Sequence, residues 1–224
     1  HGSAESYVRA KENICGNQTS SDVCIYNDKD ERVSIVVKKT VSTHVPVHGY
    51  KADLSDAFLK GEHNRDNMLA ALCVTEALGI AEKDVLLSLK AFSGLPHRLE
   101  TVATVNYVDY VDDVLATNPE STIAAIKSFD NISCLILGGE DRGYDYSELA
   151  EHLTGTDIEH VVLLPGCRDK LKTALTDFSG AIHEVDTVED AARVCHEHAP
   201  PNTTVLLSPA APSYDQFKNY EEKA

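Results

Sequence analysis

The sequence has too few basic residues for a protein that binds nucleic acid. Its 224 residues include 20 Lys and Arg against 36 Asp and Glu, which gives a formal net charge of −16. A chain that binds a polyanion usually carries a basic stripe, so we expect no nucleic-acid partner. No apolar run approaches the ~20 residues of a membrane helix, and no signal peptide opens the chain. We therefore expect a cytoplasmic protein that binds no membrane.

The sequence also lacks cysteines and histidines at the close spacing that is typical of metal sites and redox disulfides. The six cysteines form no C-x-x-C pair and lie mostly in apolar runs, which predicts reduced core thiols: Cys15, Cys24, Cys73, Cys134, Cys167 and Cys195. The histidines show no ligand spacing either, so we interpret these as surface or core residues: His44, His48, His152, His160, His183, His196 and His198. A chain of this length buries roughly 70% of its unfolded surface on folding, so it needs no disulfide or metal ion to stabilise its core.

The first ninety or so residues combine helical and extended patterns. Apolar residues at helical spacing predict a helix over 4–17, and a buried strand follows over 22–27. The run 32–42 is rich in Val and predicts a second extended segment. The clearest helix spans 64–80, and another spans 81–92.

From Glu100 onward, strands and helices alternate. Strands are predicted over 98–105, 108–114, 132–139, 158–166, 181–185 and 203–210, and helices over 118–129, 146–153, 168–178, 187–199 and 214–223. Apolar runs such as "CLILGG" are typical of strands buried on both faces, and the alternation with helices favours a parallel sheet. The sequence therefore predicts an α/β fold with a Rossmann-like, doubly wound, mainly parallel sheet.

The stretch "FSGLPHRLE" separates the two patterns. Pro96 cannot continue the preceding helix, because it lacks a backbone N–H and restricts the residue before it. We interpret this stretch as the joint between two domains, residues 1–92 and 93–224. A turn alone does not explain why His97 and Arg98 follow the proline.

Polar side chains follow several predicted strands of the second domain. Ligands bind at the carboxyl ends of the strands in sheets of this kind, so these side chains are expected along one rim: Asp112, Asp113, Thr117, Asn118, Asp141, Arg142, Ser208, Ser213 and Lys218. Each one alone is more often a cap or turn residue than a ligand. Together they indicate a polar rim that binds an anion.

A second polar group stands at the start of the clearest helix. "GEHNRDN" places Glu62, His63, Asn64 and Asn67 where backbone amides and the helix dipole favour a phosphate or nucleotide. An ordinary capping cluster explains the same residues, so both interpretations stay open.

Several motifs, in their order and spacing, resemble the Mur ligases. They are "LKGEHNRDNMLAAL", "FSGLPHRLETVA", "ATNPESTIAAI", "LILGGEDRGYDYSEL" and "LLSPAAPSYDQFKNYEEKA". The closing run is most similar to the branch that joins D-glutamate to UDP-N-acetylmuramoyl-L-alanine in peptidoglycan synthesis. The resemblance implies a monomeric, ATP-dependent ligase in which Mg²⁺ ions offset charge on the transferring phosphoryl group. The glutamate amine then attacks the acyl phosphate.

The resemblance also assigns residues to the nucleotide and the metal. Lys11 matches the lysine that is carbamylated in the family, where the carbamate supports Mg²⁺. Asn64 and Asn67 match asparagines near the adenine. Arg98 matches the hinge arginine that reaches the nucleotide, and Asp113 matches an aspartate near the ribose. We expect Lys11 and Arg98 to be catalytic.

A further set matches positions that hold glutamate in the family. It consists of Thr117, Arg142, Ser213 and Tyr220, with Tyr214 alongside, and we expect Arg142 to be catalytic. Arg142 stands where the family usually has lysine; it keeps the charge and can grip a carboxylate through two hydrogen bonds.

The loop that contains Thr117 departs from the family pattern. The usual "DSKATN" has Val114-Leu115 in place of its Ser-Lys pair. The loss puts local phosphate contacts in question and leaves open which enantiomer of glutamate is added.

The sequence contains no G-x-x-G-K-[ST] phosphate loop. By the resemblance, residues 1–92 are the last part of the central ATP-binding domain, and 93–224 are nearly all of the C-terminal ligase domain. We therefore expect a fragment that lacks the N-terminal domain and has no ligase activity alone. The alternatives are a Mur-type ligase that adds L-glutamate or another amino acid, a folylpolyglutamate-synthase relative, and a non-catalytic α/β binding module.

Overall fold

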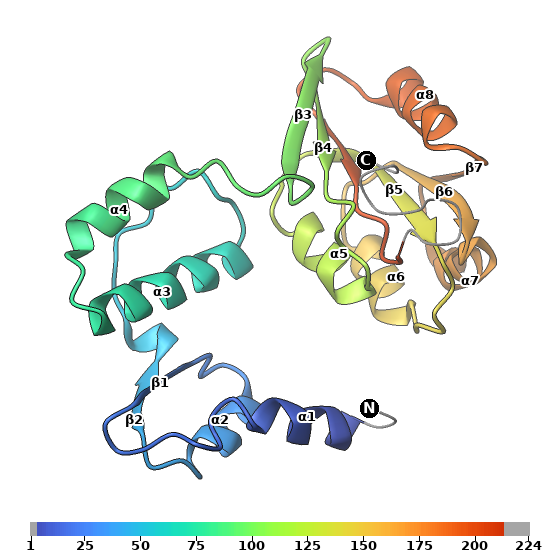
Figure 1. Ribbon diagram of the computed structural model, residues 1–224. Coiled ribbons are helices and arrows are strands. Elements are labelled where there is room, and N and C mark those ends of the chain that lie inside the picture. Colours follow the sequence, from blue (N-terminus) through green and yellow to red (C-terminus); the bar gives the residue numbers. More distant parts are fainter. Residues whose placement is uncertain (1–3, 213–224) are drawn as a thin grey trace. The chain divides into compact units, whose positions relative to one another are not determined.

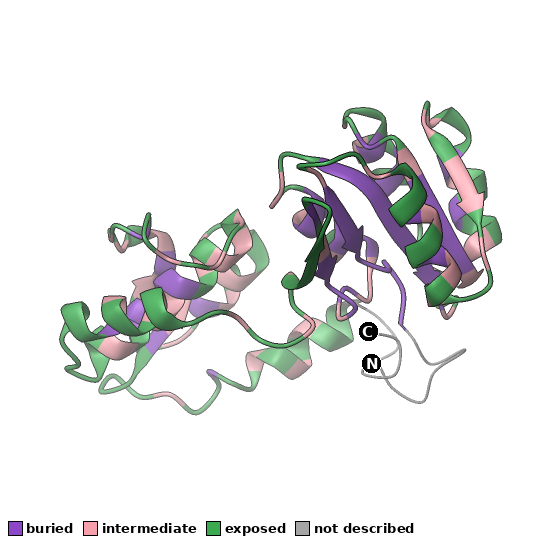
Figure 2. Cartoon of the chain, turned by 90° about the horizontal axis from the view of Figure 1, so that it is seen from above, coloured by how far each residue is buried: buried purple, intermediate pink, exposed green. Residues whose placement is uncertain are grey.

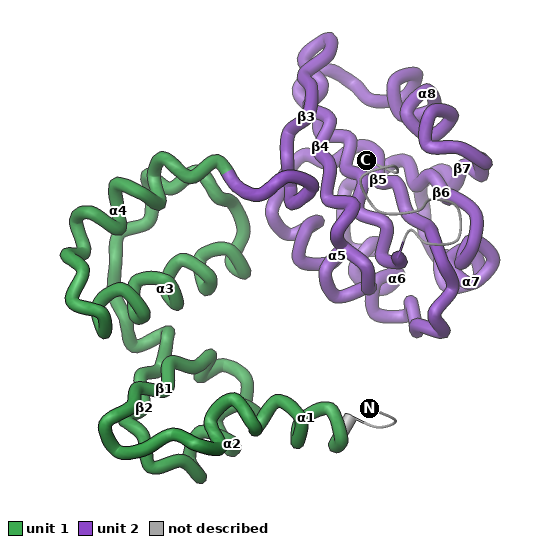
Figure 3. Tube along the Cα trace, in the orientation of Figure 1, with its two compact units in different colours: residues 1–93 green, residues 94–224 purple. Residues whose placement is uncertain are grey.

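The chain divides into two compact units, residues 1–93 and 94–224 (Figure 3). The computed structural model describes residues 4–212, in the elements that Figure 1 labels. No helix within this described range is both long and apolar enough to cross a membrane.

The first unit combines a two-stranded parallel sheet with helices. Its elements are α1 (Ala4–Glu12), β1 (Val23–Tyr26), α2 (Glu31–Val37), β2 (Thr43–Pro46), the 3₁₀ helix η1 (Val47–Gly49), α3 (Glu62–Ala77) and α4 (Glu82–Ala91). The helix α3 contacts both η1 and α4. Buried Val47, Met68, Leu72 and Val85 form the core between these elements.

The predicted extended segment over 32–42 is wrong, because most of it forms α2. Asp30 caps this helix: its Oδ1 accepts hydrogen bonds from the amides of Arg32 at 2.9 Å and Val33 at 3.3 Å. Val37, the last residue of this helix, is buried in a small cluster with Cys15 and Cys24. The cap and this burial outweigh the strand preference of the β-branched residues, since β-propensity depends strongly on context. The predicted helix over 4–17 also ends early, at Glu12.

The second unit is built on a six-stranded sheet in the order β3-β4-β8-β5-β6-β7. The strands are β3 (Glu100–Val105), β4 (Val108–Asp112), β5 (Ile132–Gly139), β6 (His160–Gly166), β7 (Ala181–Glu184) and β8 (Thr204–Leu207). β3 is antiparallel to β4, and the other neighbours are parallel. The predicted mainly parallel α/β sheet is confirmed.

Helices cover both faces of this sheet. They are α5 (Pro119–Ile126), α6 (Ser147–Thr154), α7 (Arg168–Ala174), the 3₁₀ helix η2 (Leu175–Asp177) and α8 (Val188–His198). Leu135 and Leu163 point to the face that α5, α6 and α7 cover, whereas Ile136 and Val162 point to the face of α8. This alternation follows from the two-residue period of a strand. Figure 2 shows the central strands buried between helices whose outer faces are exposed.

Gly138 allows the chain to pack closely at the carboxyl end of β5. Its φ of 123° lies in a region that L side chains rarely adopt, and an added Cβ would lie 2.6 Å from the Leu164 carbonyl oxygen. Its amide donates to the carbonyl of Pro209 at 2.9 Å. The glycine therefore lets β5, β6 and the segment after β8 converge at one edge.

Candidate functional site

The loops that follow β4, β5 and β8 lie together at the carboxyl edge of the six-stranded sheet. β8 pairs with β4 on one side and with β5 on the other. Backbone hydrogen bonds continue beyond the strands: Asp113 N donates to Leu207 O at 2.8 Å, and Glu140 N donates to Pro212 O at 2.8 Å. Segments that are far apart in the sequence therefore form one continuous edge, the position where doubly wound sheets bind ligands.

Asp113 is buried at this edge within a polar network. Ser208 Oγ donates to Asp113 Oδ2 at 2.9 Å and lies 3.1 Å from Thr122 Oγ1. The Leu99 amide donates to Asp113 Oδ1 at 3.3 Å. Burial raises the pKa of Asp113 to about 6, although these hydrogen bonds and the nearby Arg98 charge act in the opposite direction. The carboxyl group thus ties the strand ends to the segment that precedes β3.

That segment has an uncommon backbone conformation. His97 and Leu99 have φ values of 61° and 48°, in the left-handed region that costs a non-glycine residue conformational energy. His97 Nδ1 lies 2.7 Å from Asp112 Oδ2, and His97 N donates to Glu100 Oε2 at 2.8 Å. These contacts hold the segment on the edge while Arg98 is exposed. The strained pair therefore presents a cation next to the buried Asp113.

The side chains that make these hydrogen bonds also carry atoms that can bind a cation. His97, Glu100 and Asp112 each offer a ligand atom within 4.8 Å of the others. A mixed nitrogen and oxygen set of this kind can bind a divalent transition metal. These residues belong to the edge already described.

Arg142 lies in the loop after β5 and is engaged by a neighbouring carboxylate. Its Nη2 and Nε lie 2.8 and 3.0 Å from Glu140 Oε2. Lys170 Nζ forms a similar ion pair with Asp141, at 2.8 Å. Arg142 of this loop and Lys170 of α7 therefore place two cations at the carboxyl edge, and a carboxylate ligand would compete with Glu140 for the guanidinium.

The loop after β4 is anchored by apolar burial and by a helix cap. Val114 is fully buried and packs in the core under α8, while Thr117 is half-buried. Asn118 Oδ1 accepts from the Ser121 amide at 2.8 Å and caps α5. Asn118 thus acts as the cap residue that such a position usually is. Position 114 thus contributes a core contact and no polar group to the edge.

The remaining predicted site residues lie elsewhere. Lys11 is exposed on α1, with Nζ 5.3 Å from the centre of the Tyr7 ring. Asn64 donates to the Lys60 carbonyl at 2.7 Å, and Asn67 is exposed in α3. These three belong to the first unit, whereas Arg98, Asp113, Thr117 and Arg142 belong to the second. Ser213, Tyr214, Lys218 and Tyr220 lie outside the described residues.

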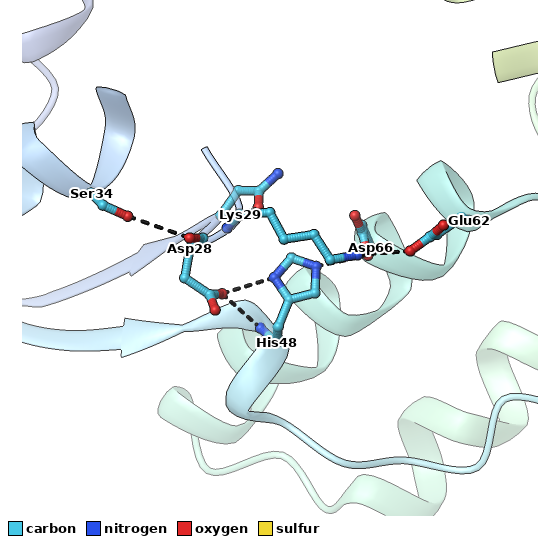
Figure 4. A network of polar contacts seen from close by, with 7 residues as sticks. Asp28, Lys29, Ser34, His48, Glu62 and Asp66 are labelled. Atoms are coloured by element: carbon cyan, nitrogen blue, oxygen red, sulfur yellow. Dashed lines mark hydrogen bonds and ion pairs between the residues drawn. The ribbon is translucent and has the colours of Figure 1, made fainter. Parts of the chain in front are cut away.

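A network of charges at the start of α3 was not predicted from the sequence (Figure 4). His48 Nδ1 lies 2.8 Å from Asp28 Oδ1, and His48 Nε2 lies 2.9 Å from Asp66 Oδ1. Lys29 Nζ lies 2.8 Å from Glu62. The hydrogen bond to Asp28 is the main cause that raises the pKa of His48, and the hydrogen bond to Asp66 is the next. The network fixes the turn after β1 against the helix that carries Asn64 and Asn67.

A family model described as Mur ligase, glutamate ligase domain, matches residues 97–211. The matched range contains the strained segment, the buried Asp113 and the three loops of the carboxyl edge. The chain belongs to the Mur ligase family.

Curated relatives of this Mur ligase chain match along its length. A UDP-N-acetylmuramoylalanine–D-glutamate ligase from Geotalea uraniireducens is 35% identical over an alignment that covers 98% of this chain and 53% of the relative. The enzyme of the same name from Natranaerobius thermophilus is 35% identical over 100% of this chain and 54% of its own. The chain therefore spans about half the length of the curated relatives it matches.

Solved structures of two ligases share the fold at lower identity. MurF from Acinetobacter baumannii has a TM-score of 0.72 at 17% identity and covers 93% of this chain and 53% of its own. A folylpolyglutamate synthase from Mycobacterium tuberculosis, complexed with ADP, has a TM-score of 0.70 at 16% identity, over 94% and 58% of the two chains. These likenesses confirm the fold.

The raised pKa of Asp113 makes a prediction about stability and pH. A carboxyl with a pKa of about 6 in the folded chain and about 3.9 in the unfolded chain binds a proton more tightly when folded. Its ionisation therefore destabilises the second unit, by on the order of 3 kcal/mol above pH 6. This penalty decreases as the pH falls from 6 to 4, and it is absent below pH 4.

The comparison of the Asp113→Asn variant with the parent chain measures this effect. The amide side chain of the variant does not titrate, so we expect the parent to gain unfolding free energy relative to the variant as the pH falls from 7 to 4. Guanidinium unfolding at several pH values gives the difference. A difference that does not change with pH would show that Asp113 is ionised at no cost.

Proposed function

We propose that this chain forms part of an ATP-dependent ligase that joins D-glutamate to UDP-N-acetylmuramoyl-L-alanine. The observation that carries the proposal is the match to enzymes of that name over 98% and 100% of the chain, at 35% identity. The likeness to a solved structure complexed with ADP agrees with a nucleotide substrate. In this proposal residues 1–92 end the ATP-binding domain, residues 93–224 form the glutamate-binding domain, and the enzyme is a cytoplasmic monomer.

The proposed reaction proceeds in two steps. The carboxylate of UDP-N-acetylmuramoyl-L-alanine attacks the γ-phosphorus of ATP and gives an acyl phosphate and ADP. The amine of D-glutamate then attacks the acyl carbon, the tetrahedral intermediate expels phosphate, and the amine nitrogen loses a proton. The first step places negative charge on phosphoryl oxygens, and the second places it on the acyl oxygen and then on the departing phosphate, so placed cations and orientation supply most of the catalysis.

Arg98 is the proposed catalytic cation on the nucleotide side. The contacts of His97 and Leu99 fix the backbone on both sides of it, so its side chain extends from a fixed point of the edge. Asp113 is assigned to the ribose. Because Asp113 is only 5% exposed, its larger contribution is to anchor the Leu99 amide. Asn64 and Asn67 are assigned to the adenine.

Arg142 is the proposed partner of a glutamate carboxylate. The guanidinium already donates two hydrogen bonds, both to Glu140 Oε2, and a substrate carboxylate that replaced Glu140 would accept through both of its oxygens. Thr117 follows β4, which β8 separates from β5 in the sheet, and is assigned to the same substrate. Ser213, Tyr214 and Tyr220 complete the assignment from the family motif.

Mg²⁺ is assigned to Lys11 in a modified form only. The side chain is exposed, which leaves its amine open to reaction with CO₂. An ammonium has no lone pair for a metal, so Lys11 as it stands does not fit a magnesium ion, whereas a carbamate offers oxygen ligands that do. The carbamate is therefore the proposed ligand for magnesium. A bound magnesium ion would neutralise charge on the phosphoryl group.

The release of ADP by the full-length protein tests the proposed function. We expect release to require both UDP-N-acetylmuramoyl-L-alanine and D-glutamate, because the acyl phosphate forms only on the first and is consumed only by the second. The 224-residue chain alone is expected to release none, since it has no phosphate loop. Activity with L-glutamate but not D-glutamate would assign the enzyme to a related ligase, as the Val114-Leu115 pair allows. Inactivity with every amino acid would favour a binding module.

A further inference from the structure

Three histidines converge on the side of the second unit away from its carboxyl edge. His160 is the first residue of β6, His183 lies within β7, and His198 is the last residue of α8. Their ring centres lie 4.5, 5.0 and 5.3 Å apart. Each ring offers a nitrogen within 4.8 Å of the other two. No residue of this cluster has a role in the proposed ligase reaction.

The topology explains why these side chains meet. His160 and Val162 alternate with Val161 along β6, so His160 points to the face that α8 covers, as does Val162. His183 is in register with Val162 on the adjacent strand and points to the same face. α8 leads from the end of β7 to the start of β8, so its last turn lies near the amino ends of the parallel strands. His198 therefore reaches the other two rings there.

We propose that His160, His183 and His198 form a binding site for a divalent transition metal, with Zn²⁺ as the expected ion. Three imidazoles leave a fourth tetrahedral position for water, a ligand set that zinc accepts. Tetrahedral zinc with Zn–N bonds of about 2.05 Å places its nitrogens about 3.3 Å apart. The ligand nitrogens here are already within 4.8 Å of one another, and His160 Nδ1 and His183 Nε2 are 3.0 Å apart.

Small side-chain adjustments would complete the site. His160 and His183 now share one hydrogen bond, so the ring that donates it would carry its proton on the other nitrogen when both bind the metal. His198 is exposed, and its ring can rotate toward the other two. Burial lowers the pKa values of His160 and His183, which favours the neutral imidazole that binds metals. The ion would link α8 to two strands of the sheet.

Zinc titration of the 224-residue chain tests the site. By isothermal titration calorimetry we expect one Zn²⁺ per chain at this cluster, counted apart from any ion at His97, Glu100 and Asp112. Co²⁺ in its place is expected to give the visible absorption of a tetrahedral ion. The His198→Ala and His183→Ala variants are each expected to weaken Zn²⁺ binding at least ~10-fold. His196→Ala is the matched control, because His196 lies on the same helix but contacts Tyr110, with Nδ1 3.2 Å from the hydroxyl.

The unfolding temperatures of the same variants give a second test, which does not require a measured affinity. Saturating Zn²⁺ is expected to raise the unfolding temperature of the parent chain and of His196→Ala, but not of His198→Ala. Because His198 is exposed, its variant keeps the fold even if His183→Ala does not, and circular dichroism confirms this. Absence of saturable binding, or equal weakening by His196→Ala, would overturn the site.

Discussion

The Arg98→Ala variant of the full-length enzyme is expected to lose on the order of 10²–10³-fold in kcat/KM for ATP, the loss that follows removal of one placed electrostatic contact to a developing charge. The backbone on both sides of Arg98 supports this expectation, since residues 97 and 99 keep left-handed conformations that cost a non-glycine residue free energy. The steady-state rate of ADP release measures the loss.

Two further variants separate catalysis from folding. Arg98→Lys keeps the charge without the planar fork, so its rate is expected to lie between those of the parent and Arg98→Ala. Arg193→Ala removes another exposed arginine, which pairs with Asp190 on α8, and it is expected to leave the rate unchanged. A loss of less than threefold in Arg98→Ala would remove this residue from the nucleotide site.

The Leu163→Ala variant is expected to destabilise the second unit by about 2–5 kcal/mol. Leu163 is fully buried in the middle of the core beneath α5, α6 and α7. Truncation to Ala therefore loses apolar burial and leaves a cavity that strands on both sides of β6 prevent from collapsing. Hydrogen exchange of the β5 and β6 amides reports the free energy, because the central strands exchange through opening of the whole unit.

Leu95→Ala is the matched control for this variant. Leu95 belongs to the same unit and is 61% exposed, so its truncation is expected to change the unfolding free energy by no more than about 0.5 kcal/mol. Equal losses in the two variants would mean that burial in this core does not determine the stability of the sheet.

The sheet was predictable because its signals are local. The apolar run of β5 and the helical spacing of α5 and α8 each stand out within a short window of sequence. The same logic failed for residues 32–42, where the Val-rich run indicated a strand but the Asp30 cap started a helix. A single helix cap of this kind contributes as much free energy as the strand preference of several residues.

The polar site was predictable in outline only. The order of the elements was sufficient to place Asp113 and Arg142 at the ends of two strands. It did not show that Asp113 is buried against Ser208 and the Leu99 amide, since those contacts join residues up to 95 positions apart. The histidine cluster was missed for the same reason, because its members come from two strands and a helix.

The Michaelis constant for D-glutamate in the Arg142→Ala variant tests most directly whether the carboxyl edge is the amino-acid site. In the full-length enzyme we expect this KM to rise at least ~10-fold, because a charge-assisted carboxylate contact is worth about 1.5–3 kcal/mol. The KM for ATP and the parameters of Arg193→Ala are expected to stay the same. An unchanged KM for D-glutamate would contradict the assignment of this edge.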